Sequence, residues 1–251
     1  AKDSSVAQAI DTATITVQKS FCTSGPAGGN LEIRNVDIDA PGDDEEWKPL
    51  DIVEIEVEVE NIGVNDVDDV IVEIGLFDNL GKNVAGQLDF FNTDEREIEL
   101  GDISDGNEEK GTFEFKIPAD LDKGSYKLAV KSFSEKSGVG ELKECIDSSD
   151  DFDNKIFHPI SIDIDDDKDD PIVVDDIIFP SEAVCGDIVS GSFTVFNIGD
   201  NDEDQIRVTL ENAELGIKEQ FEIRENLDEG DSEKMQTAFT LPSSAKDGTY
   251  T

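Results

Sequence analysis

A short sequence signature occurs twice in this chain. Residues 51–63 read DIVEIEVEVENIG and residues 187–199 read DIVSGSFTVFNIG, so the first three and last three letters match at an offset of 136. Four further residues recur at an offset of 124, where Gly106, Pro118, Gly124 and Tyr126 match Gly230, Pro242, Gly248 and Tyr250. A unit repeated at this scale indicates tandem domains. The change of offset indicates an insertion of 12 residues in the first copy, between Gly63 and Gly106.

Each unit contains runs in which apolar and polar residues alternate. Between Val53 and Glu60, four aliphatic residues alternate with four glutamates. A period of two places the two kinds on opposite faces of a β-strand. One face on a core and one in water is typical of an antiparallel sheet. Similar rows occur at residues 70–76, 113–117, 126–130, 193–195 and 206–210.

The many short strands, separated by turn sequences such as Asp105-Gly106, predict an all-β chain of tandem antiparallel β-sandwiches. We expect an N-terminal segment at residues 1–29, with a strand at residues 13–18, and a first sandwich at residues 30–164. An acidic linker follows at residues 165–171, and the second sandwich occupies residues 172–251. The second copy reaches only as far as Tyr250, so we expect its last strand to be incomplete or to be supplied from elsewhere.

The chain is strongly acidic, which limits the partners that it can bind. It carries 62 acidic against 20 basic residues, with a formal net charge of −42. This charge excludes nucleic acid as a direct partner, because a phosphate backbone requires a basic surface, and it opposes docking on anionic lipid. No stretch approaches the roughly 20 apolar residues of a membrane span. The acidity fits solubility, cation binding or high-salt adaptation, and the sequence does not separate these.

The three cysteines are Cys22, Cys145 and Cys185, and an odd number leaves one without an internal partner. Cys22 precedes the expected strands of the first sandwich, and Cys145 follows the last clear strand pattern. A Cys22–Cys145 disulfide would close this unit, while Cys185 would pair beyond residue 251. The alternative is three buried free thiols. No C-x-x-C motif supports a zinc or thioredoxin-like site.

Residues suited to catalysis are scarce. The sole histidine, His158, lies in a strand-like run, where a structural or surface role is far commoner than a catalytic one. Carboxylates are so frequent that no pair stands out as a general acid and base. Residue types alone do not exclude glycosidase activity, which needs two carboxylates. However, only Trp47 and two tyrosines could stack on a sugar. We expect no enzymatic activity, and we expect Trp47 to be a core residue rather than an exposed contact.

Clustered aspartates make Ca²⁺ the most serious chemical candidate, because this ion takes six to eight oxygen ligands from carboxylates and carbonyls on turns. Asp200-x-Asp202-x-Asp204 has the alternating acids that could begin such a loop, although neither the glycine nor the closing glutamate of an EF-hand follows. The acidic stretch after Cys145 is the stronger region. Its candidate ligands are Asp147, Asp151, Asp153, Asp163, Asp165 and Asp167. The alternative is a solvated acidic surface that fixes no ion.

The strand motifs resemble a known family. The sequence WKPLDIVEIEVEVENIG at 47–63 is followed by DVIVEIGLFD at 69–78, FKIP at 115–118 and GSYKL at 124–128. These motifs resemble the CARDB-type immunoglobulin-like domains of archaeal surface proteins. The fuller arrangement resembles S-layer proteins of small archaea: FC at 21–22, ECID at 144–147, SSDDFDN at 148–154 and AVCGD at 183–187. The resemblance implies secretion to the cell surface, a mature N-terminus near Ala1 and a longer C-terminal part, and it brings no active site.

These observations favour a secreted structural protein that self-assembles into an S-layer or a related polymer. The expected N-terminal strand and the incomplete last strand suggest β-strand addition between neighbouring copies. The alternative is an adhesin stalk or CARDB spacer that presents another domain. A third hypothesis is an accessory region of a secreted hydrolase.

Overall fold

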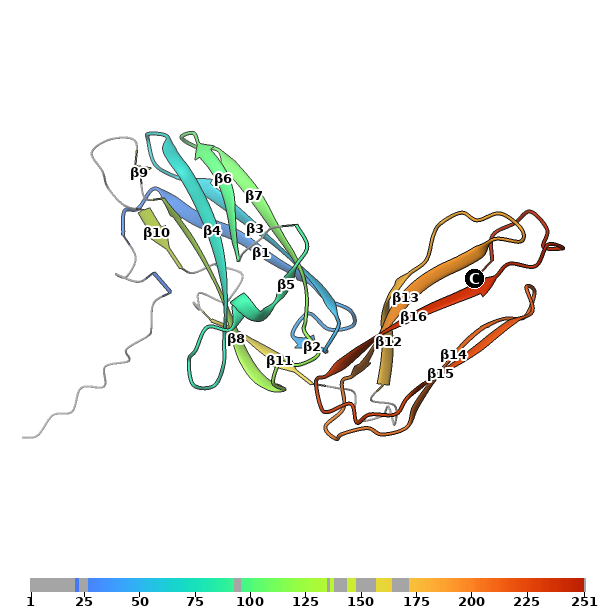
Figure 1. Cartoon of the computed structure of the whole chain (residues 1–251). Helices are drawn as coiled ribbons and strands as arrows, with labels where there is room; N and C mark the ends of the chain where they lie inside the picture. The colour runs from blue at the N-terminus through green and yellow to red at the C-terminus, as the bar shows by residue number, and fades with distance from the viewer. Residues whose placement is uncertain are drawn as a thin grey trace, which may run out of the picture.

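The computed structural model describes residues 21–22, 27–92, 96–134, 136–137, 144–147, 157–163 and 172–250. In this part of the chain the protein is all-β and forms two sandwiches that follow each other along the molecule (Figure 1). The prediction of an all-β chain of antiparallel sandwiches is confirmed. The N-terminal strand expected near residues 13–18 and the linker 165–171 lie outside the described residues.

The first sandwich packs a four-stranded sheet against a seven-stranded sheet. The first sheet has the order β1 (Leu31–Asp39), β3 (Ile52–Asn61), β7 (Glu108–Lys116) and β5 (Asp89–Phe90). The second has the order β2 (Glu46–Trp47), β11 (His158–Ile162), β8 (Gly124–Ser134), β4 (Val67–Phe77) and β6 (Glu97–Ile103). Two short strands extend it, β10 (Glu144–Ile146) on β8 and β9 (Lys136–Ser137) on β4. Among the strands that the structure describes, only β2 and β11 pair in parallel.

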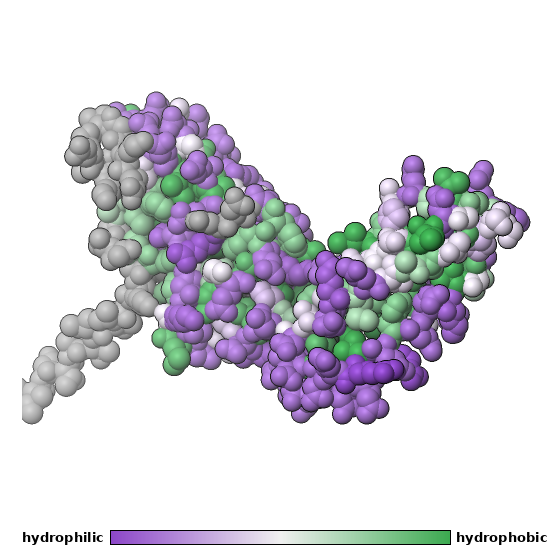
Figure 2. Space-filling view, in the orientation of Figure 1, coloured by the Kyte–Doolittle hydropathy of each residue, from purple (hydrophilic) through white to green (hydrophobic). Residues whose placement is uncertain are grey.

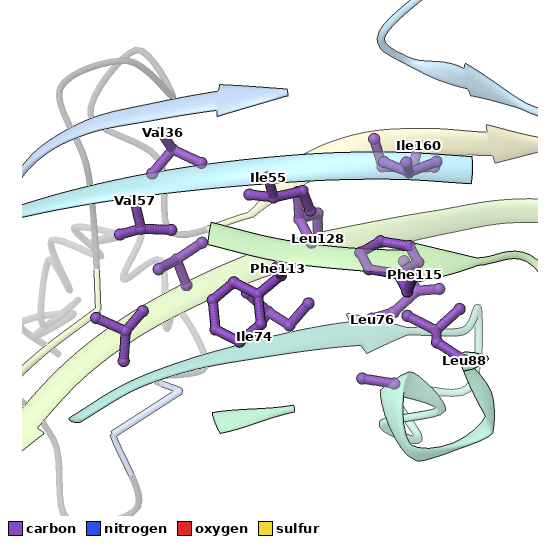
Figure 3. Close-up of a cluster of buried hydrophobic side chains, with 14 of the residues drawn as sticks. Val36, Ile55, Val57, Ile74, Leu76, Leu88, Phe113, Phe115, Leu128 and Ile160 are labelled. Carbon is purple, nitrogen blue, oxygen red and sulfur yellow. The ribbon is translucent and has the colours of Figure 1, made fainter. Parts of the chain in front are cut away.

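The alternating rows of the sequence form the core between these sheets. The aliphatic side chains of β3, from Val53 to Val59, are fully buried, as are Phe113 and Phe115 on β7. Figure 3 shows this row facing Ile74 of β4 and Leu128 of β8. Burial of one such side chain contributes about 1.5–3 kcal/mol. Because a one-residue slip would turn the whole row toward water, the burial also fixes the register of the strands.

The second sandwich is smaller. Its larger sheet has the order β12 (Ile172–Ile178), β13 (Ile188–Asn197) and β16 (Ser232–Thr240). The facing sheet pairs β14 (Ile206–Asn212) with β15 (Ile217–Ile223). Its buried cluster is built around Phe193, Val195 and Ile206. All strand pairs described in this sandwich are antiparallel.

The change of offset in the sequence corresponds to a connection between strands. In the first sandwich, residues 78–96 link β4 to β6 and contain the 3-10 helix η1 (Ala85–Gln87) and β5. In the second sandwich, β14 and β15 are joined by residues 213–216 alone. The inserted residues cover the rim of the first core, since Ala85 and Leu88 are buried against it.

The repeated asparagine of the N-I-G signature has the same structural role in both sandwiches. Asn61 is fully buried, and its Nδ2 donates hydrogen bonds of 2.8 Å to the carbonyl oxygens of Asn65 and Ile103. Asn197 is also fully buried, and its Nδ2 donates to the carbonyl oxygens of Asn201 and Leu227 at 2.8 and 2.9 Å. Because Ile103 belongs to the facing sheet, the bond from Asn61 ties the two layers together.

The repeated tyrosine forms the same corner twice. The hydroxyl of Tyr126, at the start of β8, donates to the carbonyl oxygen of Asp122. The hydroxyl of Tyr250 donates to the carbonyl oxygen of Lys246 at 2.7 Å. A tyrosine that bonds to backbone a few residues upstream is the tyrosine corner of immunoglobulin-like sandwiches. Burial, with the nearby Asp122 and Asp78 carboxylates as lesser causes, raises the pKa of the Tyr126 phenol.

Candidate functional site

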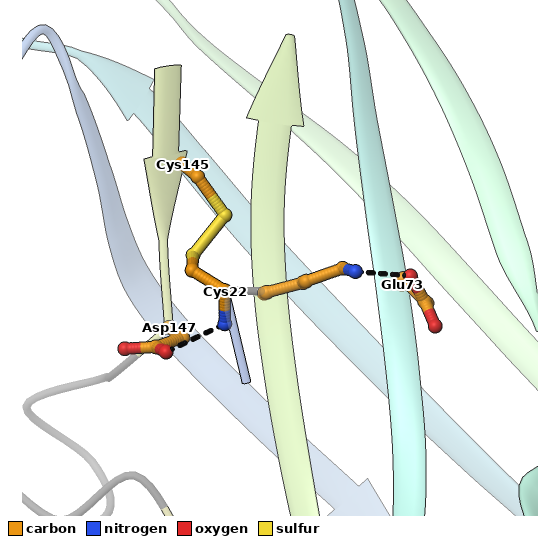
Figure 4. Close-up of a disulfide and its surroundings, with 5 residues drawn as sticks. Cys22, Glu73, Cys145 and Asp147 are labelled. Atoms are coloured by element: carbon orange, nitrogen blue, oxygen red, sulfur yellow. Dashed lines mark hydrogen bonds and ion pairs between the residues drawn. A yellow bond between two sulfur atoms is a disulfide. The ribbon is translucent and has the colours of Figure 1, made fainter. Parts of the chain in front are cut away.

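A disulfide fastens the segment before β1 to one end of the first sandwich. Cys22 and Cys145 are joined, with their Cα atoms 6.0 Å apart, and Cys145 lies on β10 (Figure 4). The backbone amide of Cys22 donates to the buried carboxylate of Asp147 at 2.8 Å. The backbones of Ala27 and Cys145 exchange hydrogen bonds of 3.0 and 2.9 Å. The N-terminal segment is therefore held at the β10 edge by covalent and polar contacts together.

Glu144 adds a second attachment for the same segment. Its buried carboxylate accepts hydrogen bonds from the backbone amide of Gly29 at 2.8 Å and from Asn30 Nδ2 at 2.6 Å. Gly28 has a φ of +77°, and a Cβ atom there would lie 1.9 Å from a Glu144 oxygen. Glycine at position 28 thus allows the chain to pass directly over the carboxylate.

A buried ion cluster lies beside the disulfide. Glu73 on β4 is 4% exposed, and its carboxylate is 2.5 Å from Lys131 Nζ and 2.9 Å from Arg96 Nε. Figure 4 shows the ion pair of Glu73 as a dashed line beside the disulfide. The Nζ atom of Lys131 also lies 4.7 Å from the ring centre of Phe21, the residue before Cys22. Sequence reasoning missed this cluster, because Glu73 alternates with apolar residues just as the solvent-facing glutamates do. Its signal is the cross-strand register, which places Glu73 opposite Lys131.

The glutamate row on the outer face of β3 is partly neutralised by the neighbouring strand. Lys110 on β7 places its Nζ 2.6 Å from Glu56 and 3.2 Å from Glu58. Hydrogen bonds to Glu56 and Glu58 raise the pKa of the Lys110 ammonium. Glu108, two residues earlier, has a raised carboxyl pKa, because it shares a hydrogen bond with Glu58 and is repelled by its charge. Excess negative charge is thus concentrated at this end of the row.

Two lysines of the first sandwich bind acids of the second. Lys116, at the end of β7, places its Nζ 2.7 Å from Asp175 and 3.1 Å from Asp176, both on β12. Burial lowers the pKa of Lys116, but the hydrogen bonds to both aspartates outweigh it and raise the pKa. The same hydrogen bond lowers the pKa of Asp175.

The second lysine of this joint is Lys123, just before β8. It forms ion pairs with Asp200 and, at 3.8 Å, with Glu229. Next to Glu229, a Cβ atom on Gly230 would lie 2.8 Å from the Asp120 backbone, so the two sandwiches meet closely here. Sequence reasoning missed both lysines, because nothing local distinguishes them from the other basic residues.

The structure describes two of the six predicted calcium ligands. Asp147 is buried and accepts the hydrogen bond from Cys22, whereas Asp163 is exposed just after β11. Asp151, Asp153, Asp165 and Asp167 lie outside the described residues. Over the described ranges, including Asp200–Asp204, no three acidic, histidine or cysteine side chains come close enough together to hold a metal ion. The Ca²⁺ site at 147–167 stays a prediction.

His158 and Trp47 both contact residues of the first sandwich. His158 Nε2 on β11 lies 3.2 Å from a Glu45 carboxylate oxygen. Trp47 is 1% exposed, donates from Nε1 to the carbonyl oxygen of Asp44 at 3.0 Å, and packs edge-on against Phe115. Trp47 is therefore a core residue.

The second sandwich carries an open apolar groove of about 860 Å³ between its sheets. Its lining includes Val189, Leu210, Ile217, Phe239 and Leu241. Half of the exposed large hydrophobic residues in the described chain lie between Val174 and Ile188, and one of them, Ile177, lines the groove. Figure 2 shows hydrophobic residues gathered on the upper part of the second sandwich, whereas hydrophilic residues cover much of the remaining visible surface.

No family model and no curated protein matches this chain. The solved C-terminal domain of wzt aligns with 55% of this chain and 77% of its own, at 15% identity and a TM-score of 0.39. The sporulation control protein Spo0M from Bacillus subtilis aligns with 84% of this chain and 91% of its own, at 11% identity and a TM-score of 0.31. The red sea bream transglutaminase aligns with 86% of this chain and 27% of its own, at 12% identity and a TM-score of 0.29. The fold assignment rests on the strands and sheets described above.

Among the residues that the structure places, no helix has the length and apolar character needed to cross a membrane.

Proposed function

We propose that this protein is a secreted structural protein that self-assembles into a cell-surface layer, or a related extracellular polymer, through contacts between β-sandwiches. The observation that carries the proposal is the pair of lysine contacts, at Lys116 and Lys123, through which two copies of one unit are stacked. A unit that already binds its own repeat end to end is suited to bind further copies. The two ends of the pair differ chemically, with a fastened N-terminal segment at one and an open apolar groove at the other.

Three features support the extracellular, structural part of the proposal. The Cys22–Cys145 disulfide is of a kind that persists in oxidising environments. The buried carboxylates near it stabilise the fold: Glu144 accepts a hydrogen bond from the segment before β1, and Glu73 forms an ion pair with Lys131. The strand and cysteine motifs resemble CARDB-type domains and archaeal S-layer proteins.

Calcium has a defined place in the proposal. With a net charge of −42, copies of this chain repel one another, and divalent cations would lower that repulsion and bridge acidic faces. The candidate ligands are Asp147, Asp151, Asp153, Asp163, Asp165 and Asp167. The proposed partner is a second copy of the chain, and the proposal requires no other partner.

Electron microscopy of the purified chain tests the proposal. We expect sheets or filaments at millimolar Ca²⁺ and their dissolution by EDTA at low salt. Polymers that withstand EDTA would remove calcium from the mechanism but leave the structural role. Isolated particles under all conditions would contradict self-assembly.

The second candidate function is an adhesin stalk or CARDB spacer, which the same stacking of sandwiches favours. A stalk needs stiffness rather than self-association. Light scattering that finds a monomer at every protein and Ca²⁺ concentration, together with a large non-repeated domain in the full-length protein, would support this alternative.

A further inference from the structure

The disulfide closes a covalent loop around most of the first sandwich. Cys22 and Cys145 have a sequence separation of 123, and every strand from β1 to β9 lies between them. Among the described strands of this sandwich, β11 and the end of β10 follow Cys145, before residues 164–171 lead to β12. A covalent path therefore runs from Cys22 across the disulfide to Cys145 and through β11 to the second sandwich, without passing through β1–β9.

The disulfide is also the shorter of the two paths that leave Cys22. The backbones of Ala27 and Cys145 exchange hydrogen bonds, so the chain from Cys22 to Ala27 begins and ends beside Cys145. Tension applied ahead of Cys22 therefore passes across the disulfide rather than along residues 23–26. In the reduced chain, the same tension continues through Ala27 to β1, which is the edge strand of the four-stranded sheet.

β10 and β11 lie one after the other on the same edge of β8. β10 pairs with residues 132–134 of β8 and β11 with residues 124–128, while β4 fills the opposite edge by pairing with residues 127–133. In Figure 1, β11 lies at the end of β8 nearest the second sandwich. Residues 147–157 connect β10 to β11, whereas residues 129–131 of β8 bridge the same gap. The connection is therefore longer than the gap that it spans.

β11 attaches the second sandwich covalently to the first. It lies between β8 and β2, and the amide of Ser161 donates to the carbonyl oxygen of Glu45 at 2.8 Å. Its Ile160 and Ile162 are buried in the core, and Ile162 pairs with Gly124 at the joint end of β8. Tension from the second sandwich therefore pulls β11 along its own axis, so that its hydrogen bonds to both neighbours are loaded together rather than one after another.

Contacts from several elements hold the opposite end of this path. The amide of Cys22 donates to Asp147, and Glu144 accepts hydrogen bonds from the segment before β1. Phe21 packs edge-on against Phe77 of β4, with ring centres 5.4 Å apart. The disulfide end is thus fastened to β10, to β4 and to the segment before β1, whereas the covalent attachment at the joint end is the single strand β11.

We propose that β11 is a mechanical latch, a strand that tension releases, and that the Cys22–Cys145 disulfide limits the extension that follows. Under tension β11 leaves its place between β8 and β2, and the connection at 147–157 straightens. The disulfide and the backbone beyond Cys145 then carry the whole load, and β1–β9 carry none. This inference rests on the proposed structural role, in which the chain carries tension between the units that it joins.

The length of the chain defines the size of the step. Straightened, the chain from Cys145 to Asp163 extends about 65 Å. In the folded sandwich its ends are about 30 Å apart, the length of β8 from Phe133 to Gly124. Release of β11 therefore lengthens the chain by roughly 35 Å. Unfolding of the closed loop would add roughly 400 Å, because the two cysteines have a sequence separation of 123.

Stretching of single full chains in optical tweezers tests this inference. The oxidised chain should show the step of roughly 35 Å and keep the closed loop out of the extended length. After reduction, the same chain should extend by roughly 400 Å more, because the load then enters through β1. The second sandwich contributes equally to both records, so the difference belongs to the first.

Two substitutions that remove the same side chain distinguish β11 from the strands inside the loop. Ile160 on β11 and Ile33 on β1 are each 2% exposed. In the oxidised chain held at constant force, Ile160→Ala should release the short step at least about tenfold faster, and Ile33→Ala should change its rate by less than about twofold. After reduction, Ile33→Ala should speed the long extension.

Because single chains are stretched, the result does not depend on the proposed self-assembly. If the chain stays monomeric but shows the short step, self-assembly fails and the latch stands. If polymers form but the oxidised chain releases the full length of the loop, the disulfide does not limit extension and the inference is overturned. Equal effects of Ile160→Ala and Ile33→Ala on the short step would also overturn it, since β11 would then have no special role.

Discussion

Asn61 and Asn197 are equivalent residues that make the same set of hydrogen bonds in the two sandwiches. Besides the two bonds from each Nδ2, each side-chain oxygen accepts from the backbone amide two residues later, that of Gly63 at 2.9 Å and that of Gly199 at 3.0 Å. This explains why asparagine and glycine recur at fixed spacing while the residues between the signature ends vary. In the first sandwich the signature marks the place where one sheet is tied to the other, and in the second it ties β13 to the segment that follows β15.

We predict that Asn61→Ala and Asn197→Ala each destabilise only their own sandwich. Each substitution removes a buried group that satisfies two carbonyl oxygens and one amide, so the cost should be about 2–4 kcal/mol. Trp47, the sole tryptophan, is buried in the first sandwich and reports its unfolding in urea. Asn61→Ala should shift the fluorescence transition, and Asn197→Ala should leave it in place while lowering a second transition seen by circular dichroism. Equal shifts in the fluorescence of both variants would contradict independent roles.

The disulfide gives a second prediction. Cys22→Ser with Cys145→Ser should lower the unfolding free energy of the first sandwich by about 4 kcal/mol, because the crosslink closes a loop with a sequence separation of 123. Reduction of the unmodified chain should have a similar effect on the Trp47 transition in urea. Cys185→Ser is the matched control, since this exposed thiol is free in the structure and its removal should leave the transition unchanged. A reduced protein as stable as the oxidised one would show that polar contacts alone hold the segment.

A third prediction concerns pH and the glutamate row. The pKa of Glu108 is raised in the folded state, so folding favours its protonated form, and stability is lost as the pH rises through that pKa. Glu108→Gln should therefore raise the urea midpoint at pH 7 and change it little at pH 4. Glu109→Gln removes the same charge from the other face of the strand and should show a smaller pH dependence. A high salt concentration should reduce the gain from Glu108→Gln, because the repulsion is exposed to solvent.

Features of the fold that depend on neighbouring residues can be predicted from the sequence, whereas features that depend on residues far apart in the sequence cannot. Period-two rows such as Val53–Val59 are predictable, because burial of every second residue is a local requirement that any sandwich imposes. The repeat also predicts which strands correspond. Glu73 was not identifiable, because its burial depends on Lys131 and Arg96, which lie far along the chain and meet it only in the folded register. The lysines of the joint are hidden for the same reason, since Lys116 and Asp175 belong to different sandwiches.

The final prediction concerns that joint. Lys116→Met keeps a long unbranched side chain but removes the charge that binds Asp175 and Asp176, so the two sandwiches should separate and the radius of gyration in X-ray scattering should rise. Asp175 has a lowered pKa and Lys116 a raised one, so their contribution is complete between their ordinary pKa values of 3.8 and 10.5. It is lost below pH 3.8, as Asp175 is protonated, and above pH 10.5, as Lys116 loses its charge. Lys127→Met, which alters an exposed lysine on β8, is the control and should leave the scattering curve unchanged. An identical curve for Lys116→Met at low salt would mean that the Lys123 ion pairs and the close approach at Gly230 hold the joint without Lys116.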